Sequence, residues 1–153
     1  TPLRQIRIAI MIVMTGLILS GVIDSSFGIL DSAAGVRIFG PVNFASDNSI
    51  TIDKLGHSFG PVGLTTTAAN AANGTSNITF WEGGTANLAN VSVGAGAFPG
   101  SLTVVSTGGT VQQAAGGTIL VPNTVAGSTA TVSFSSLAGA VTLGNVGNSI
   151  VPA

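Results

Sequence analysis

The longest apolar run of the chain limits its possible folds more than any other feature of the sequence. Residues 8–23 carry no charged side chain, and Ile, Leu, Met and Val dominate them. Such a run has to be buried, because exposing apolar surface to water costs about 25 cal/mol per Å². We predict one long helix over residues 3–35, apolar on all sides as is typical of a helix buried in a membrane or in a bundle.

Basic residues precede the apolar run and none follows it closely. Arg4 and Arg7 lie ahead of it, and the next Lys or Arg is Arg37. By the positive-inside rule, we expect the N-terminus to face the cytoplasm and the rest of the chain to be exported. The chain begins at Thr1 rather than at a Met. We therefore also expect that a leader is cut off ahead of the apolar run.

Glycine recurs inside the predicted helix. Glycine weakens a helix by about 1 kcal/mol relative to Ala, so its repetition indicates a compensating benefit. Small residues let apolar helices approach closely, and we predict that this helix packs against copies of itself. The alternative is that a membrane anchor simply tolerates glycine. The residues predicted to form the packing face are Ile8, Ile12, Gly16, Leu19, Gly21, Ile23, Gly28 and Gly35.

The character of the sequence changes after Gly35. Short runs rich in Val, Ile, Thr and Phe are separated by Gly, Pro and Asn, and "SLTVVS" and "TATVSFSSL" alternate as half-buried strands do. The spacing of the turn signals favours an immunoglobulin-like β-sandwich. We find no tandem repeat, and we expect a long surface loop over residues 63–77. The predicted fold class is α+β, with a helical domain over residues 1–35 and an extracellular β domain over residues 36–153.

Charge is scarce and unevenly placed. The chain has 4 Lys and Arg and 5 Asp and Glu, and beyond Lys54 the only charged side chain is Glu82. A net charge of −1 argues against nucleic acid as a partner, because phosphate binding needs clustered Lys and Arg. Soluble domains carry about 25% charged residues. This surface is therefore expected to depend on Thr, Ser, Asn and Gly, on glycans, or on cover by neighbouring subunits.

The sequence offers little for catalysis or for metal binding. It has no cysteine and one histidine, His57, which turn residues flank. No G-x-S-x-G motif accompanies His57, so we interpret it as a loop or edge-strand residue. Asp47 and Asp53 do not match a calcium-binding loop. We predict that the protein is not an enzyme and has no catalytic, metal-binding or cofactor-binding residues and no cofactor.

Three Asn-x-Ser/Thr triplets lie close together, at Asn73, Asn77 and Asn90. In an exported protein such triplets are acceptor sites for N-glycosylation. Glycans would hydrate a surface that has few charges. The alternative is that the triplets arise by chance in a chain rich in Thr and Ser.

A basic lead, an apolar N-terminal segment of some 30 residues and a β-rich domain poor in charge together resemble a type IV pilin, closest to archaeal members of that family. The resemblance implies that a prepilin peptidase cuts ahead of the apolar segment and that a pilus assembly machinery polymerises the subunits. The helix would anchor the subunit in the membrane and then form the core of a homopolymer. We therefore predict a structural subunit of an extracellular cell-surface filament that serves adhesion.

Other classes of protein stay open at this point. A monomeric membrane-anchored binding module or adhesin would be soluble only in detergent, whereas a filament subunit would form polymers in plain buffer. A fibre built by donor-strand exchange needs a short alternating segment, and the apolar run is longer than that. A viral envelope or coat protein with a similar anchor is a more remote alternative.

Overall fold

The computed structural model describes residues 17–19, 23–24, 35–67, 76–94, 100–122 and 129–151. These residues form fifteen strands, and none of them is helical. The strands are β1 (Leu17–Leu19), β2 (Ile23–Asp24), β3 (Arg37–Ile38), β4 (Val42–Ser46), β5 (Ile50–Ile52), β6 (Ser58–Phe59), β7 (Val62–Thr66), β8 (Ile78–Glu82), β9 (Ala86–Val93), β10 (Leu102–Ser106), β11 (Val111–Gln113), β12 (Ile119–Val121), β13 (Val132–Ser136), β14 (Val141–Thr142) and β15 (Ser149–Ile150).

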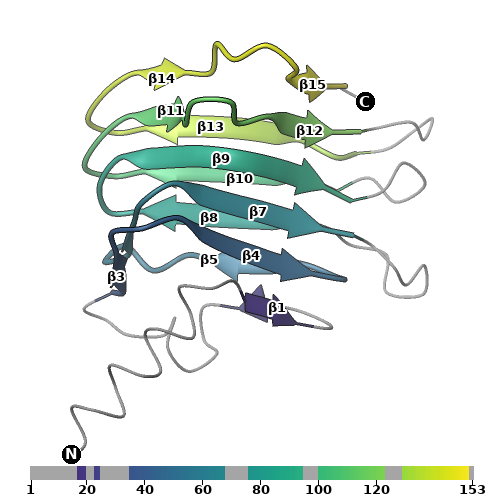
Figure 1. Cartoon of the computed structure of the whole chain (residues 1–153), viewed down its shortest axis with the longest axis horizontal. Coiled ribbons are helices and arrows are strands. Elements are labelled where there is room, and N and C mark those ends of the chain that lie inside the picture. The colour runs from purple at the N-terminus through teal and green to yellow at the C-terminus, as the bar shows by residue number, and fades with distance from the viewer. Residues whose placement is uncertain are drawn as a thin grey trace, which may run out of the picture.

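Every pair of neighbouring strands in the described residues is parallel. One sheet of eight strands runs in the order β1-β4-β7-β9-β11-β14, with β12 pairing with both β9 and β15. A second sheet of five strands runs β13-β10-β8-β5-β2, and β3 pairs with β6 in a short third sheet. Parallel neighbours cannot be joined by a tight hairpin. The chain instead passes from one large sheet to the other and returns one level higher (Figure 1).

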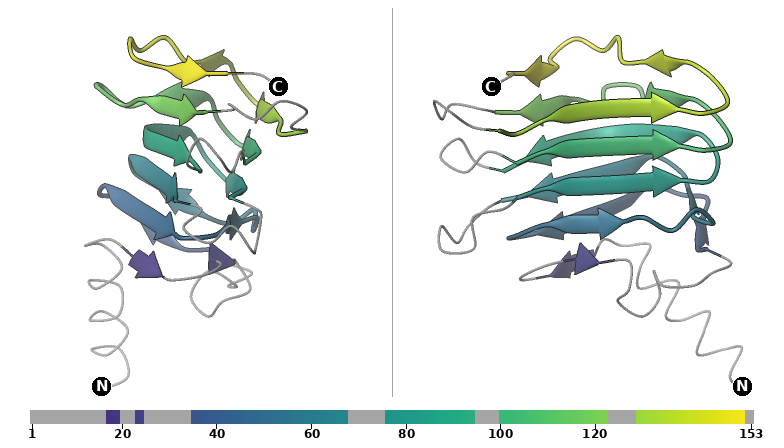
Figure 2. Two further views of the ribbon diagram at one scale, coloured as in Figure 1. Left: turned by 90° about the vertical axis from the view of Figure 1, so that its right-hand side faces the viewer. Right: turned by 180° about the vertical axis from the view of Figure 1, so that it is seen from behind.

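The result is a stack of coils, a β-solenoid-like arrangement. Seen from the side and from behind, the two large sheets face each other and successive coils rise in chain order (Figure 2). The strands β1 and β2 lie at one end of the stack, and β13, β14 and β15 lie at the other. Each coil therefore contacts mainly the coil before it and the coil after it, as in repeat proteins.

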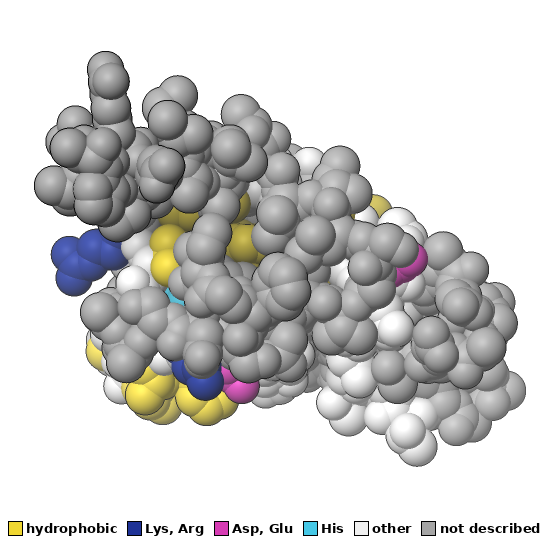
Figure 3. Space-filling model, turned by 90° about the horizontal axis from the view of Figure 1, so that it is seen from below, with side chains coloured by type: hydrophobic (Ala, Val, Ile, Leu, Met, Phe, Trp, Pro, Cys, Tyr) yellow, Lys and Arg dark blue, Asp and Glu magenta, His cyan; other side chains and the backbone are white. Residues whose placement is uncertain are grey.

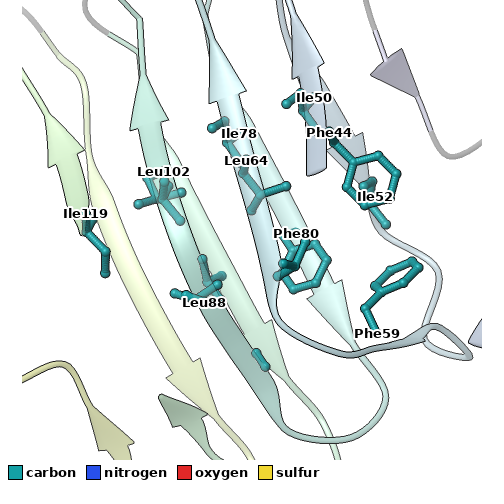
Figure 4. Packing of buried hydrophobic residues seen from close by; sticks show 14 of the residues in the cluster. Phe44, Ile50, Ile52, Phe59, Leu64, Ile78, Phe80, Leu88, Leu102 and Ile119 are labelled. Atoms are coloured by element: carbon teal, nitrogen blue, oxygen red, sulfur yellow. The ribbon is translucent and has the colours of Figure 1, made fainter. Parts of the chain in front are cut away.

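Alternation along each strand decides which side chains enter the core. In β8 and in β10, every second residue is buried. Because neighbouring strands are in register, the buried residues form columns along the stack: Ile50, Ile78 and Leu102 make one column. These residues are almost fully buried, and they point into the space between the two sheets (Figure 4).

Three aromatic side chains fill the core near the N-terminal end of the stack. The ring of Phe59 packs edge-on against Phe44 at a centroid distance of 5.6 Å and lies tilted against Phe80 at 5.9 Å. All three are buried. Burying one large apolar side chain contributes about 1.5–3 kcal/mol, so this cluster is a major source of stability for the first coils.

The predicted α+β fold class is wrong for the described residues. Leu17–Leu19 and Ile23–Asp24 lie inside the predicted helix and are strands. A continuous apolar run is typical of a buried parallel strand as well as of a buried helix. The β domain is not an immunoglobulin-like sandwich either, because its two sheets consist of parallel strands that alternate between the sheets at every coil.

The predicted positions of strands within residues 36–153 are confirmed where the structure describes them, whereas the predicted topology is wrong. The runs "SLTVVS" and "TATVSFSSL" contain β10 and β13. The predicted loop over residues 63–77 is wrong at its start, where β7 extends to Thr66, and residues 68–75 lie outside the described part. The prediction that the chain has no tandem repeat is also wrong, since the coils are structural repeats that stack on one another.

Unequal loops conceal that repeat in the sequence. Ile50 aligns with Ile78, Ile78 with Leu102 and Leu102 with Val132, which are spacings of 28, 24 and 30 residues. A search for one constant period misses such a pattern.

Few charged side chains are visible among the described residues on one face of the molecule. The face seen from below in Figure 3 shows a few Lys, Arg, Asp or Glu side chains, with hydrophobic side chains beside them. Among the described residues no helix is long and apolar enough to span a membrane.

Candidate functional site

A column of polar side chains follows one corner of the stack. Glu82, Ser106 and Ser136 each end a strand of the second sheet, and they are in register with one another. We call these three residues the corner column. Each is followed by a turn that contains Gly or Ala, in the segments "EGGT", "STGGT" and "SSLAGA".

The two serines join each coil to the coil before it. Ser106 Oγ donates to the carbonyl of Gly84 at 2.6 Å, and Ser136 Oγ donates to the carbonyl of Gly109 at 2.6 Å. Each hydroxyl also accepts a backbone N–H from its own turn, from Gly109 at 3.2 Å and from Gly139 at 2.9 Å. These serines were not among the predicted site residues, although the recurrence of Ser before a Gly-containing turn is a signal for them in the sequence.

Glu82 takes the same position in the earliest coil of the corner column, but it is a carboxylate. Its side chain is only 1% exposed. Both carboxylate oxygens accept the backbone N–H of Phe59, at 3.1 and 3.3 Å, and Oε1 also accepts the N–H of Gly84 at 3.4 Å. Glu82 therefore ties the turn after β8 to β6 in the coil below.

Burial changes the acidity of this carboxyl group. Removing the carboxylate from water disfavours its charged form and raises the pKa of Glu82 from 4.5 to about 7. The N–H groups of Phe59 and Gly84 act in the opposite direction, because they stabilise the charged form. Glu82 thus changes its charge close to neutral pH while it is enclosed in the stack.

His57 lies next to this corner and is fully buried. Its Nδ1 accepts the backbone N–H of Val36 at 3.1 Å, and its ring stacks on Phe59 with centroids 5.4 Å apart. Its carbonyl accepts the N–H of Gly83 at 2.7 Å. His57 lies in the loop directly before β6, as predicted, but its side chain is in the core, and the residue joins three successive levels of the stack.

The side chain of Glu82 is occupied by the backbone of its own chain. A catalytic carboxyl group has to reach its substrate, whereas Glu82 is enclosed and both of its oxygens already accept backbone N–H groups. Within the described ranges no group of three or more His, Asp or Glu residues is placed to hold a metal ion. What the arrangement can do chemically is to hold or release one proton.

A second polar network joins the last two coils. The amide of Gln113 donates to Asn148 Oδ1 at 2.8 Å and accepts from Asn148 Nδ2 at 2.9 Å. Asn148 Oδ1 also accepts the N–H of Ile119 at 2.9 Å, and Asn145 Nδ2 donates to the carbonyl of Ala114 at 2.7 Å. These side chains replace strand pairing where the chain bends between β11 and β12.

Of the predicted packing face, the structure describes three positions. Leu19 lies in β1 and Ile23 in β2, at the N-terminal end of the stack. Gly35 has a φ of 73°, and a Cβ atom there would overlap the carbonyl of Gly56. Gly35 thus permits a close approach of two backbones at a turn. The other five positions, Ile8, Ile12, Gly16, Gly21 and Gly28, lie outside the described residues.

Two of the three candidate glycosylation sites are described, and both asparagines are exposed. Asn77 Oδ1 accepts the N–H of Ser101 at 2.8 Å, and Asn90 Oδ1 accepts the N–H of Thr118 at 3.2 Å. The carbonyl oxygen of each side chain therefore links two coils. A glycan is attached through the amide nitrogen, so glycosylation of these residues stays a prediction. Asn73 lies outside the described residues.

The C-terminal coil is the most open part of the described structure. Val141 aligns with Val111 in the coil below it, and Ile150 aligns with Val121. Val111 and Val121 are 0% and 1% exposed, whereas Val141 and Ile150 are 44% and 38% exposed. Positions that belong to the core in the inner coils are thus open to solvent at this end.

Comparison with known proteins assigns no relationship. No protein-family model, no curated protein and no solved structure matches this chain.

Proposed function

We propose that this chain is a structural, non-enzymatic subunit of an extracellular filament on the cell surface, and that it serves attachment. The observation that carries the proposal is the open-ended stack, in which each coil is held by the next and the last described coil leaves core positions exposed. Stacks of this kind extend by adding coils. A contact that repeats head to tail without closing produces a fibre.

The distribution of charge supports the same function. From residue 55 onward Glu82 is the only charged side chain, and it is buried. Like charges on two approaching surfaces would repel each other, and this part of the chain offers none. The exposed residues that the structure describes in this part are Thr, Ser, Asn, Gln, Gly and apolar residues, which suits a surface that is covered by neighbours.

The filament in this proposal is held together by stacked coils. The resemblance to type IV pilins also implied a membrane stage, a prepilin peptidase and a pilus assembly machinery. These partners stay predictions of that resemblance. The homopolymer and the extracellular location are the parts that we carry into the proposal.

Electron microscopy of the native material tests the proposed function. Surface structures are sheared from the source cells without detergent, labelled with an antibody against this chain and imaged. We expect labelled fibres of uniform diameter. Labelled protein that leaves the cells only in detergent, as single particles, would contradict the filament and favour a membrane-anchored monomer.

One observation favours that second candidate, a binding module or adhesin. Phe39 is 91% exposed in the turn between β3 and β4. Aromatic side chains are enriched at binding surfaces, so Phe39 could contact a partner directly. If this second role holds, replacing Phe39 with Ser should weaken attachment of cells to a surface, and neither the parent chain nor the variant should form fibres.

A further inference from the structure

The last coil of the stack is in register with the strands at the other end. Leu120 aligns with Ser149, and Val121 aligns with Ile150. The column of Ser149 and Leu120 runs down through β9, β7 and β4 and ends in β1, where Ile18 aligns with Ala45. In the described residues β1 is thus the first strand of the column and β15 is the last.

The second sheet has the same two ends. Its first strand is β2, and its last strand is β13. In β13 the N–H of Leu137 and the carbonyl of Thr131 bond to β10. In a parallel strand, alternate residues face opposite neighbours. Val132, Phe134 and Ser136 therefore direct their backbone N–H and C=O groups to the outer edge, where no described strand pairs with β13.

A natural edge strand is usually blocked by charged side chains or by proline. The described edge strands β13, β14 and β15 contain neither. Partly buried Val132, Phe134 and Leu143 pack on the core from this coil. The surface has the composition of an inner coil, and in this molecule an inner coil is always covered by another coil of the same chain.

We propose that a second copy of this chain covers the C-terminal coil, with its β1 paired in parallel to β15 and its β2 paired in parallel to β13. Continuing the register places Ile18 of the second copy beside Ser149 and Ile23 beside Val132. The contact is the coil-on-coil packing that already joins the coils within one chain. This inference rests on the proposed filament and specifies which surfaces join its subunits.

Disulfide cross-linking tests this contact directly. Because the chain has no cysteine, every disulfide that forms involves the introduced cysteines. Neighbouring parallel strands lie about 4.8 Å apart, which falls within the Cα separations of about 4.4–6.8 Å that a disulfide spans. Two full-length variants are made, Ile18→Cys and Ser149→Cys, and they are mixed under mild oxidation. We expect a disulfide-linked dimer in the mixture and little dimer from either variant alone.

The matched control is Leu120→Cys. Leu120 lies in the same column as Ser149, one coil further in, and is 39% exposed. It should not form a disulfide with Ile18→Cys, because a whole coil separates the two positions. Dimers of Ser149→Cys alone, in equal yield to the mixture, would show a tail-to-tail contact and overturn the proposal. A mixture that stays monomeric would overturn it as well.

Charge provides a second test on the same surface. Ile150→Lys places an ammonium group at the exposed end, and Leu120→Lys places one on an inner strand with nearly the same exposure. In sedimentation velocity at rising protein concentration, Ile150→Lys should reduce the large species at least tenfold, and Leu120→Lys should leave them unchanged. Equal association of both variants and the parent chain would contradict the proposed contact.

These results separate the inference from the proposed function. Labelled fibres on cells together with a monomeric cysteine mixture would keep the filament and reject this contact. Specific disulfide dimers without fibres on cells would keep the contact and reject the filament.

Discussion

Replacing Glu82 with Gln should make this protein more stable at neutral pH, although it removes a side chain that binds the backbone. The carboxyl group is 1% exposed, and burial raises its pKa to about 7. At pH 7.5 the folded protein therefore holds a buried negative charge. Gln keeps the shape of the side chain and one acceptor oxygen for the N–H of Phe59, and it carries no charge.

The size of the effect follows from the shift in the pKa of Glu82. From 4.5 in the unfolded chain to about 7 in the fold, at 1.36 kcal/mol per pKa unit, the upper limit is about 3 kcal/mol. Since the folded state binds the proton more tightly, this contribution is fully present below pH 4.5. It falls as the pH rises and is lost above about pH 7.

The assay is urea unfolding at pH values between 4.5 and 7.5, monitored by the fluorescence of Trp81. Trp81 is the only tryptophan of the chain and precedes Glu82 in β8. The parent protein should lose up to about 3 kcal/mol across this range relative to the Glu82→Gln variant.

Two outcomes would refute this reasoning. If the variant keeps the pH slope of the parent, Glu82 is not the group that titrates. If the variant is the less stable protein at pH 7.5, the N–H groups of Phe59 and Gly84 outweigh the cost of burying the charge.

Three further predictions concern stability and use the same unfolding assay at pH 7. Gly35→Ala places a side chain on a left-handed backbone and against Gly56, whereas Gly116→Ala has the left-handed backbone alone, which costs about 1–2 kcal/mol. Gly35→Ala should therefore be the more destabilising of the two, and Gly144→Ala, where neither applies, should change stability by less than about 0.5 kcal/mol. Equal losses at the three positions would contradict the close approach of Gly35 and Gly56. Phe80→Ala should destabilise the protein by about 3–5 kcal/mol, because it leaves a cavity beside Phe59 in the aromatic cluster. A loss of stability below about 1 kcal/mol would mean that the cluster is loosely packed. Ser136→Ala removes the hydrogen bonds to Gly109 and Gly139 and should cost about 1–2 kcal/mol; an unchanged midpoint would show that the corner column does not hold the last coil.

The sequence by itself determined where most of the strands lie. Alternation in "SLTVVS" specifies which side chains of β10 face inward, since side chains of a strand point to opposite faces in turn. The turn signals after Ser106 and Ser136 mark where strands end. These are local properties, and a local pattern is sufficient to predict them.

The partners of those strands were decided by the tertiary structure. Alternation does not distinguish a parallel neighbour one coil away from an antiparallel neighbour in a sandwich, because both bury the same face. The loops between coils differ in length, so the period that would have revealed the stack is irregular.

In the polar corner, too, the sequence determines the residues and the tertiary structure determines their neighbours. The sequence identifies Glu82 as an isolated charge and His57 as the only histidine. Their burial side by side with Phe59 depends on three coils that meet at one corner, which no local pattern encodes.

Residues 17–24 mark the limit of sequence analysis most clearly. Their apolar character determines that they are to be buried, and a helix in lipid and a strand in a stack satisfy that demand equally well. In the structure Leu17–Leu19 pairs with β4 and Ile23–Asp24 pairs with β5. The choice between helix and strand rested on neighbours that lie 27 residues further along the chain, because pairing with them satisfies the backbone hydrogen bonds that a helix would otherwise supply.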